Sequence, residues 1–205
     1  MKLLVSVPQG PILDRFLSSD LIRRLESCAS VVWNRGSQHF TPAELGDALV
    51  GVDACLTGWD VPTIDGEILD RADRLSLVVH LGGTVAPVVT REVYERGIRV
   101  CSGNRVMARV VAEAILGFML GARRNLPWFN AAMHAGSPWP RELDRSRSLL
   151  GATVGFVGLG TVGRELLDLL VPFGVRVLVH DPHIPADALG RWPFANRCSL
   201  AECLE

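Results

Sequence analysis

The chain has 205 residues, of which 48% are hydrophobic and 21% are charged. An apolar fraction of this size supplies a buried core and argues against a disordered or low-complexity chain. Lysine and arginine together number 21 and aspartate and glutamate 22, so the formal net charge is −1. This balance gives no basic excess for binding nucleic acid or an anionic membrane. The length fits one large domain or two small ones.

No targeting segment or membrane span is visible in the sequence. The first apolar stretch ends at Pro8, which makes it too short for a secretory signal. The longest apolar window, residues 110–122, contains Glu113 and is shorter than the roughly 20 residues that span a bilayer. We therefore expect a soluble, cytoplasmic protein.

Five cysteines stand at positions 28, 55, 101, 198 and 203, and none forms a C-x-x-C pair. An odd number at scattered spacing argues against a disulfide framework or a zinc site. We expect buried thiols and no metal.

Short apolar runs alternate with helical patterns over the first half of the chain. Strands are predicted at 3–7, 30–33, 54–57, 75–80 and 98–101, and helices at 13–25, from Thr41 onward, at 65–71 and at 90–96. This alternation predicts a parallel, doubly wound sheet. In such sheets ligands bind beyond the carboxyl ends of the strands. The residues at that edge are Gly58, Trp59, His80, Leu81, Gly82, Gly83 and Thr84.

The second half begins with a predicted helix at 107–124, whose apolar residues form a broad stripe for core or interface packing. Residues 125–150, which contain several prolines, Trp139 and charged positions between 141 and 147, are predicted to form a connector. A second α/β unit follows. Its expected elements are strands at 152–158 and 175–180 and a helix at 162–173, with a last turn frayed by Pro172.

The segment Gly158-Leu159-Gly160-Thr161-Val162-Gly163 has the spacing G-x-G-x-x-G between a predicted strand and a predicted helix. Gly158 permits a tight turn, Gly160 lets a pyrophosphate approach the backbone, and Gly163 lets the helix pack closely on the strand. The amino end of the helix offers free N–H groups to phosphates. The motif therefore predicts a dinucleotide-binding turn.

Asp181 follows the next strand, 18 residues after Gly163 (181 − 163). Its carboxylate can accept hydrogen bonds from the adenosine ribose and would repel the 2′-phosphate of NADP, which favours NAD. The alternative is that Asp181 only forms a turn with Pro182. His180 and His183 flank it and are expected to be exposed or to pack.

With these residues the sequence resembles the D-isomer-specific 2-hydroxyacid dehydrogenase family over nearly its whole length. The resemblance is most specific at residues 150–163, at Phe173-Gly174 and at Asp181-Pro182. It implies an α/β fold: a flavodoxin-like parallel-sheet substrate domain at 1–104, then the first half of a Rossmann NAD-binding domain at 105–205. It further implies hydride transfer between NAD and a 2-hydroxy or 2-oxo acid, and a homodimer or a complementing chain as partner.

The resemblance also implies how the substrate is held. Backbone N–H groups of the loop that matches Leu81, Gly82, Gly83 and Thr84 bind its carboxylate together with an Arg, and a His oriented by a Glu acts as acid and base. In the family these three side chains follow the second Rossmann strand, so no catalytic residue is assigned within this chain. We expect a fragment or a truncated product that is inactive alone. The loop departs from the family pattern at residues 82–86, and the particular 2-hydroxy acid stays open.

Several residues leave two interpretations open. His80 either replaces the missing acid and base or shapes the loop. Arg105 and Arg109 either face the cleft or are solvated, and Trp59 either walls a substrate pocket or packs at the sheet edge. Ser199–Glu205 is expected to be the helix before the third Rossmann strand, so that the second unit has two strands and a bare sheet edge. The alternative functions are a non-catalytic NAD-binding regulatory or scaffold protein and an inactive gene product.

Overall fold

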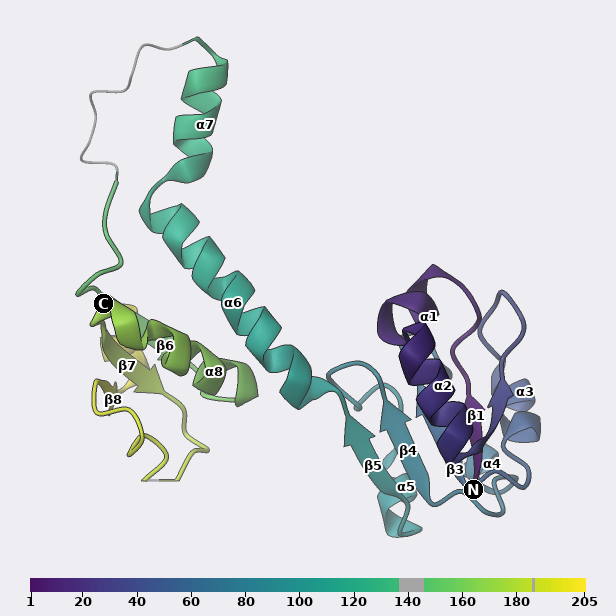
Figure 1. Cartoon of the computed structure of the whole chain (residues 1–205). Helices are drawn as coiled ribbons and strands as arrows, with labels where there is room; N and C mark the ends of the chain where they lie inside the picture. Colours follow the sequence, from purple (N-terminus) through teal and green to yellow (C-terminus); the bar gives the residue numbers. More distant parts are fainter. Residues whose placement is uncertain (137–145, 186) are drawn as a thin grey trace. The chain divides into compact units, whose positions relative to one another are not determined.

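The structure, a computed structural model, describes residues 1–136, 146–185 and 187–205. It divides into two compact units, Met1–Asn104 and Arg105–Glu205, each with its own hydrophobic core (Figure 1). Pro138, Trp139, Pro140 and the charged positions 141–145 of the predicted connector lie outside the described residues. Within the described ranges no helix has the length and apolar character of a membrane span.

The first unit is built on a five-stranded parallel sheet with the order β2-β1-β3-β4-β5. This is the flavodoxin-like order, in which the chain changes direction beside β1 and ligands bind at the carboxyl ends near that point. The register places Leu3 opposite Ala54 and His80 opposite Ser102. The predicted fold class is confirmed. The strands are β1 (Lys2–Val5), β2 (Ser30–Trp33), β3 (Ala54–Thr57), β4 (Leu77–His80) and β5 (Arg99–Ser102).

Helices bury both faces of this sheet, which explains why its inner strands β1, β3 and β4 are mostly apolar. Leu4 lies in one core cluster and the neighbouring Leu3 in the other, because successive side chains point to opposite faces. The first cluster includes residues of α3 and α4, and the second includes residues of α1 and α2. The helices are α1 (Pro11–Phe16), α2 (Ser19–Cys28), α3 (Pro42–Ala48), α4 (Gly66–Leu69) and α5 (Arg91–Glu95).

The prediction of one helix over 13–25 is wrong. Leu17 is extended, and the side chain of Ser18 accepts a hydrogen bond from the amide of Leu21, which starts a second helix. A serine at this position competes with helix continuation because its hydroxyl satisfies a free N–H at the next helix start. The apolar spacing continues across the break and hides it in the sequence.

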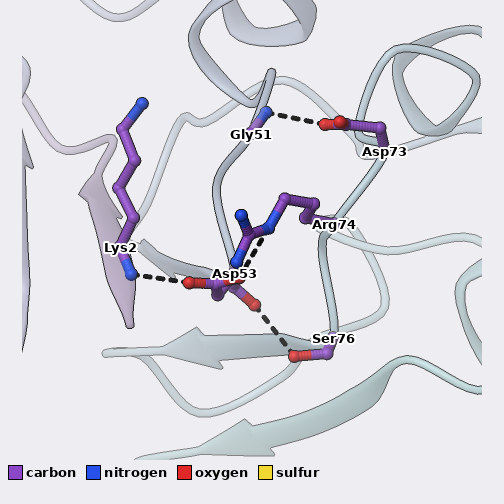
Figure 2. A network of polar contacts seen from close by, with 6 residues as sticks. All are labelled: Lys2, Gly51, Asp53, Asp73, Arg74 and Ser76. Carbon is purple, nitrogen blue, oxygen red and sulfur yellow. Dashed lines mark hydrogen bonds and ion pairs between the residues drawn. The ribbon is translucent and has the colours of Figure 1, made fainter.

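A polar network ties together the amino ends of β1, β3 and β4 (Figure 2). The carboxylate of Asp53 accepts hydrogen bonds from the backbone amide of Lys2 at 2.7 Å and from the guanidinium of Arg74 at 2.8 Å and 3.1 Å. The hydroxyl of Ser76 donates to the backbone carbonyl of Asp53 at 3.0 Å. This network fixes the end of the sheet opposite to the ligand edge.

The second unit contains a parallel sheet with the order β6-β7-β8. The expectation of two strands is therefore wrong, because β8 precedes the carboxyl-terminal helix and pairs with β7. A strand of three residues, ANR, has no apolar run or alternation that would reveal it. The strands are β6 (Thr153–Val157), β7 (Arg176–His180) and β8 (Ala195–Arg197), and the helices are α6 (Asn104–Arg123), α7 (Leu126–His134), α8 (Thr161–Leu170) and α9 (Leu200–Leu204).

Part of the predicted connector is helical. Pro127 stands in the first turn of α7, where a missing N–H costs nothing, so it starts a helix instead of breaking one. Pro172 lies in a single 3-10 turn, Val171–Phe173, that follows α8, so the helix end tightens where a frayed last turn is predicted.

Helices α8 and α9 lie on opposite faces of the second sheet. A Cβ atom built on Gly155 would stand 2.5 Å from the backbone oxygen of Cys203 in α9. The next residue, Phe156, packs in the cluster that holds Leu166, Leu167 and Leu170 of α8. One face of α6 packs against the same cluster, so the predicted stripe on this helix serves partly as core.

The cysteines are less buried than predicted. Only Cys55 is buried, and burial raises the pKa of its thiol to about 12. Cys28 and Cys101 are exposed because they lie at the end of α2 and on the edge strand β5.

Candidate functional site

The glycine-rich turn connects β6 to α8, as its spacing predicts. Gly158 has φ of +91°, a left-handed conformation that favours glycine, and its amide donates to the carbonyl of His180 at 2.8 Å. A Cβ atom on Gly163 would stand 3.3 Å from Leu159 and 3.6 Å from Phe156, so this glycine allows close packing of helix and strand. The roles expected for these two glycines agree with their geometry.

Gly160 has no structural reason to be glycine. Its φ of −78° suits any residue, and a Cβ atom built on it would meet no atom within 4 Å. It is the residue directly before α8, so the open space lies in front of the helix amino end. A glycine that neither conformation nor packing requires is expected where a ligand approaches the backbone.

The amino end of α8 has free backbone N–H donors. Within the described residues no hydrogen bond uses the backbone N–H groups of Gly160, Thr161 or Val162. The first N–H groups of a helix have no partner inside the helix and lie at the positive end of its dipole. Together they can bind a pyrophosphate without any cationic side chain.

Asp181 lies directly after β7 and contacts the glycine turn. Its carboxylate accepts hydrogen bonds from the amide of Leu159 and from the amide of His183, both at 2.8 Å. The Leu159 amide, followed by that of His183, lowers the pKa of the carboxyl below its usual value, so the group is ionised at neutral pH. Asp181 therefore forms a turn with Pro182, which is the alternative to ribose binding that the sequence offers. A carboxylate has about four acceptor positions, and these two hydrogen bonds use two of them, so the same group can also accept hydrogen bonds from a ribose.

Arg197, at the end of β8, is hydrogen-bonded to the backbone of the turn that begins at Asp181. Its Nη2 donates to the backbone carbonyl of Ile184 at 2.8 Å and to that of Asp181 at 3.3 Å. His180 is half-buried with Nδ1 3.3 Å from the carbonyl of Cys198, so it packs, while His183 is exposed. The sequence gives no signal for Arg197, because β8 itself is not recognisable there.

In the first unit the predicted loop follows β4 and also carries free donors. The amide of Leu81 donates to the carbonyl of Thr57, and the amide of Gly103 donates to the carbonyls of His80 and Gly82 at 3.0 Å each. Within the described residues no hydrogen bond uses the amides of Gly82, Gly83 or Thr84. Three successive free N–H groups can bind a carboxylate.

His80 is buried and shapes this loop. Its exposed fraction is 2%, and its Nδ1 lies 3.1 Å from the hydroxyl of Thr57. A Cβ atom on Gly82 would stand 2.4 Å from its Nε2, so any larger residue there would displace the ring. Burial lowers the pKa of His80 below its usual value and keeps the ring neutral at pH 7. These contacts favour the loop-shaping interpretation over an acid/base role.

A cavity of about 560 Å³ lies between the loops that follow β3 and β4. Trp59 lines it, is 49% exposed and packs edge-on against Phe16 with 5.1 Å between ring centroids. Both interpretations of Trp59 therefore apply, since it packs at the sheet edge and walls a cavity. Arg105 and Arg109 are exposed on α6.

Comparison with known proteins points to one family. Residues 116–205 match the family model for the D-isomer specific 2-hydroxyacid dehydrogenase, NAD binding domain. A D-3-phosphoglycerate dehydrogenase of Mycobacterium leprae is 31% identical over 185 residues, which are 90% of this chain and 34% of that protein. A hydroxypyruvate reductase of Thermotoga maritima is 25% identical over 149 residues, which are 73% of this chain and 48% of that protein.

A solved structure, a phosphoglycerate oxidoreductase from Rhizobium etli, aligns with a TM-score of 0.74 and 26% identity over 100% of this chain and 62% of that one. The chain thus spans between about a third and a half of the length of these curated relatives. Together with the turn at 158–163 and its contact to Asp181, these matches support the D-isomer specific 2-hydroxyacid dehydrogenase family and NAD as the cofactor.

Proposed function

We propose that the chain belongs to an oxidoreductase that transfers a hydride between NAD(H) and a 2-hydroxy or 2-oxo acid. Residues 105–205 would supply the NAD-binding half and residues 1–104 the substrate domain. The observation that carries the proposal is Gly160, whose lack of a side chain is required by neither its φ nor its packing. A pyrophosphate that binds against the backbone would explain why residue 160 is a glycine.

The residues of the second unit fit this cofactor. The free amides of Gly160, Thr161 and Val162 would hold the pyrophosphate, while Gly158, Leu159 and Gly163 shape the turn. The ionised carboxylate of Asp181 would accept hydrogen bonds from the ribose hydroxyls. The nicotinamide of the bound cofactor supplies the hydride chemistry.

The first unit would hold the other reactant. The free amides of Gly82, Gly83 and Thr84, next to Leu81, would bind the carboxylate of a 2-oxo acid. The family's Arg, Glu and His are assigned to no residue of 1–205. We therefore propose that these 205 residues bind NADH but do not turn over a 2-oxo acid without further residues.

A glycine-to-alanine comparison tests the cofactor site. Gly160→Ala should leave thermal unfolding unchanged, because its Cβ meets open space, and should weaken NADH binding about tenfold or more by occupying the phosphate position. Gly117→Ala is the matched control, since Gly117 also has open space but lies on α6, away from the turn. NADH fluorescence titration of the three proteins measures the effect. Equal affinity of all three would reject the site.

We also propose a cytoplasmic homodimer. Support for the dimer comes from apolar side chains on α6 that no described residue covers, among them Val110 at 66% and Phe118 at 77% exposure. Phe118→Glu should shift the mass measured by light scattering from dimer to monomer. A monomeric parent protein would refute the dimer.

A further inference from the structure

We propose that the cavity beside the 81–84 loop selects 2-hydroxy and 2-oxo acids with an apolar side chain and disfavours phosphorylated ones. The inference deepens the proposed function and rests on it. It is not what the names of the relatives suggest, since several are D-3-phosphoglycerate dehydrogenases. The wall of the cavity lies entirely in the first unit.

The wall of the cavity combines free backbone amides with apolar side chains. Gly83 and Thr84, whose amides are free, line it together with Trp59 and Val61. A carboxylate bound by the amides would therefore place the rest of the molecule against the indole. Phe16 holds that indole by edge-on packing, so the exposed half of Trp59 is a preformed apolar surface.

The charges of the cavity oppose a second anion. Asp60 is the acidic residue of the cavity wall, and it makes no ion pair with another described residue. The ring of His80 is buried, and burial favours its neutral form by lowering its pKa. Among the described residues that line the cavity there is no Lys or Arg. A phosphate dianion here would lose its hydration shell beside a carboxylate without gaining a cation.

Two matched ligand pairs test the inference on the 205-residue chain. Pyruvate and 4-methyl-2-oxopentanoate differ by an isopropyl group, and glycerate and 3-phosphoglycerate differ by a phosphate. The readout is the indole N–H resonance of Trp59 in two-dimensional ¹H–¹⁵N NMR spectra, which Trp59→Phe identifies by its disappearance. We expect 4-methyl-2-oxopentanoate to bind about tenfold more tightly than pyruvate. We expect 3-phosphoglycerate to bind more weakly than glycerate.

Two further variants assign the selectivity to named side chains. Because the Trp59 variants lack the indole N–H, ligand binding to all variants is followed by the backbone amide resonances of Gly83 and Thr84. Trp59→Ala should remove the advantage of 4-methyl-2-oxopentanoate over pyruvate, whereas Trp59→Phe should keep most of it. Asp60→Asn should strengthen 3-phosphoglycerate binding roughly two- to fivefold and leave 4-methyl-2-oxopentanoate unchanged. Asparagine is the matched replacement because Asp60 has φ of +59°, a conformation that asparagine tolerates.

The outcomes separate the inference from the proposed function. Binding of 3-phosphoglycerate as tight as that of glycerate, or no effect of Trp59→Ala, would overturn the inference. Absence of saturable binding by all four acids would overturn it too. NADH added to the same sample should shift the amide resonances of residues 158–163. If NADH fails to do so while the acids bind as expected, the proposed function fails and the selectivity of the cavity stands.

Discussion

Asp53 carries more structural contacts than its position at a strand start suggests. Its carboxylate joins the backbone amide of Lys2 in β1 to the guanidinium of Arg74 before β4, and Asp53 directly precedes β3. The Lys2 amide is the main cause that lowers the pKa of Asp53 below its usual value, with Arg74 acting in the same direction. The ionised form is therefore favoured in the folded protein.

This shift predicts an acid-dependent loss of stability. The folded pKa lies below the unfolded value of about 3.9, so the unfolded chain binds the proton more readily. The contribution of Asp53 is then fully present above about pH 4 and is lost as the pH falls through the lower, folded pKa. Urea unfolding of the parent protein and of Asp53→Asn between pH 6 and pH 3 measures it. The two midpoints should differ at pH 6 and converge towards pH 3; a difference that grows at low pH would contradict the assignment.

Arg197 is the second residue with an effect beyond its own position. It donates to the backbone carbonyls of Ile184 and Asp181, and so fixes the turn that carries the carboxylate proposed to bind the ribose. Arg197→Gln should weaken NADH binding about fivefold, the value of roughly one lost hydrogen bond. Arg191→Gln is the control, because Arg191 pairs with Asp168 on the surface away from that turn. Unchanged NADH affinity in Arg197→Gln would mean that the turn holds without it.

At the scale of elements, the packing of α9 on β6 depends on a glycine. A Cβ atom on Gly155 would stand 2.5 Å from the backbone oxygen of Cys203, and backbone cannot rotate away as a side chain can. Gly155→Ala should therefore lower the free energy of unfolding of the second unit by roughly 1–3 kcal/mol. Gly160→Ala, where the added atom meets open space, should change it by less than about 0.5 kcal/mol. Equal stability of the two variants in urea would show that α9 does not pack as described.

The elements also show what a sequence can reveal. Strands of the first unit are evident because burial on both faces requires continuous apolar runs, as in the run that contains Val78. The break between α1 and α2 escapes prediction because the apolar spacing continues through Leu17 while Ser18 caps the next helix. Strand β8 escapes because pairing with β7, and not its composition, makes it a strand.

Residues of the candidate site could likewise be predicted only where their signal is local in the sequence. The turn at 158–163 is evident because the G-x-G-x-x-G spacing between a strand and a helix is a local pattern in the sequence. The supporting contacts join residues far apart in sequence, such as Thr57 with His80 and Arg197 with Ile184. No local pattern records these pairs, so the buried state of His80 becomes evident only in three dimensions.

At the scale of the whole molecule, the two units have separate cores. The clusters around Leu4 and Leu3 contain residues of the first unit, and the cluster around Leu167 contains residues of the second. Proteins open in cooperative units of this kind with different free energies. A ligand stabilises only the unit whose folded state binds it.

We therefore expect NADH to protect one unit selectively against hydrogen exchange. At about 100 times its Kd, NADH should raise the opening free energy of amides in β7, such as Val177 and Val179, by up to about 2.7 kcal/mol. Amides of β3, such as Cys55, should keep their exchange rates, since the glycine turn and Asp181 belong to the other unit. Gly160→Ala should abolish the protection of β7 at the same NADH concentration. Equal protection of β3 and β7 would mean that the two cores unfold together, and that binding in one unit is felt by the whole chain.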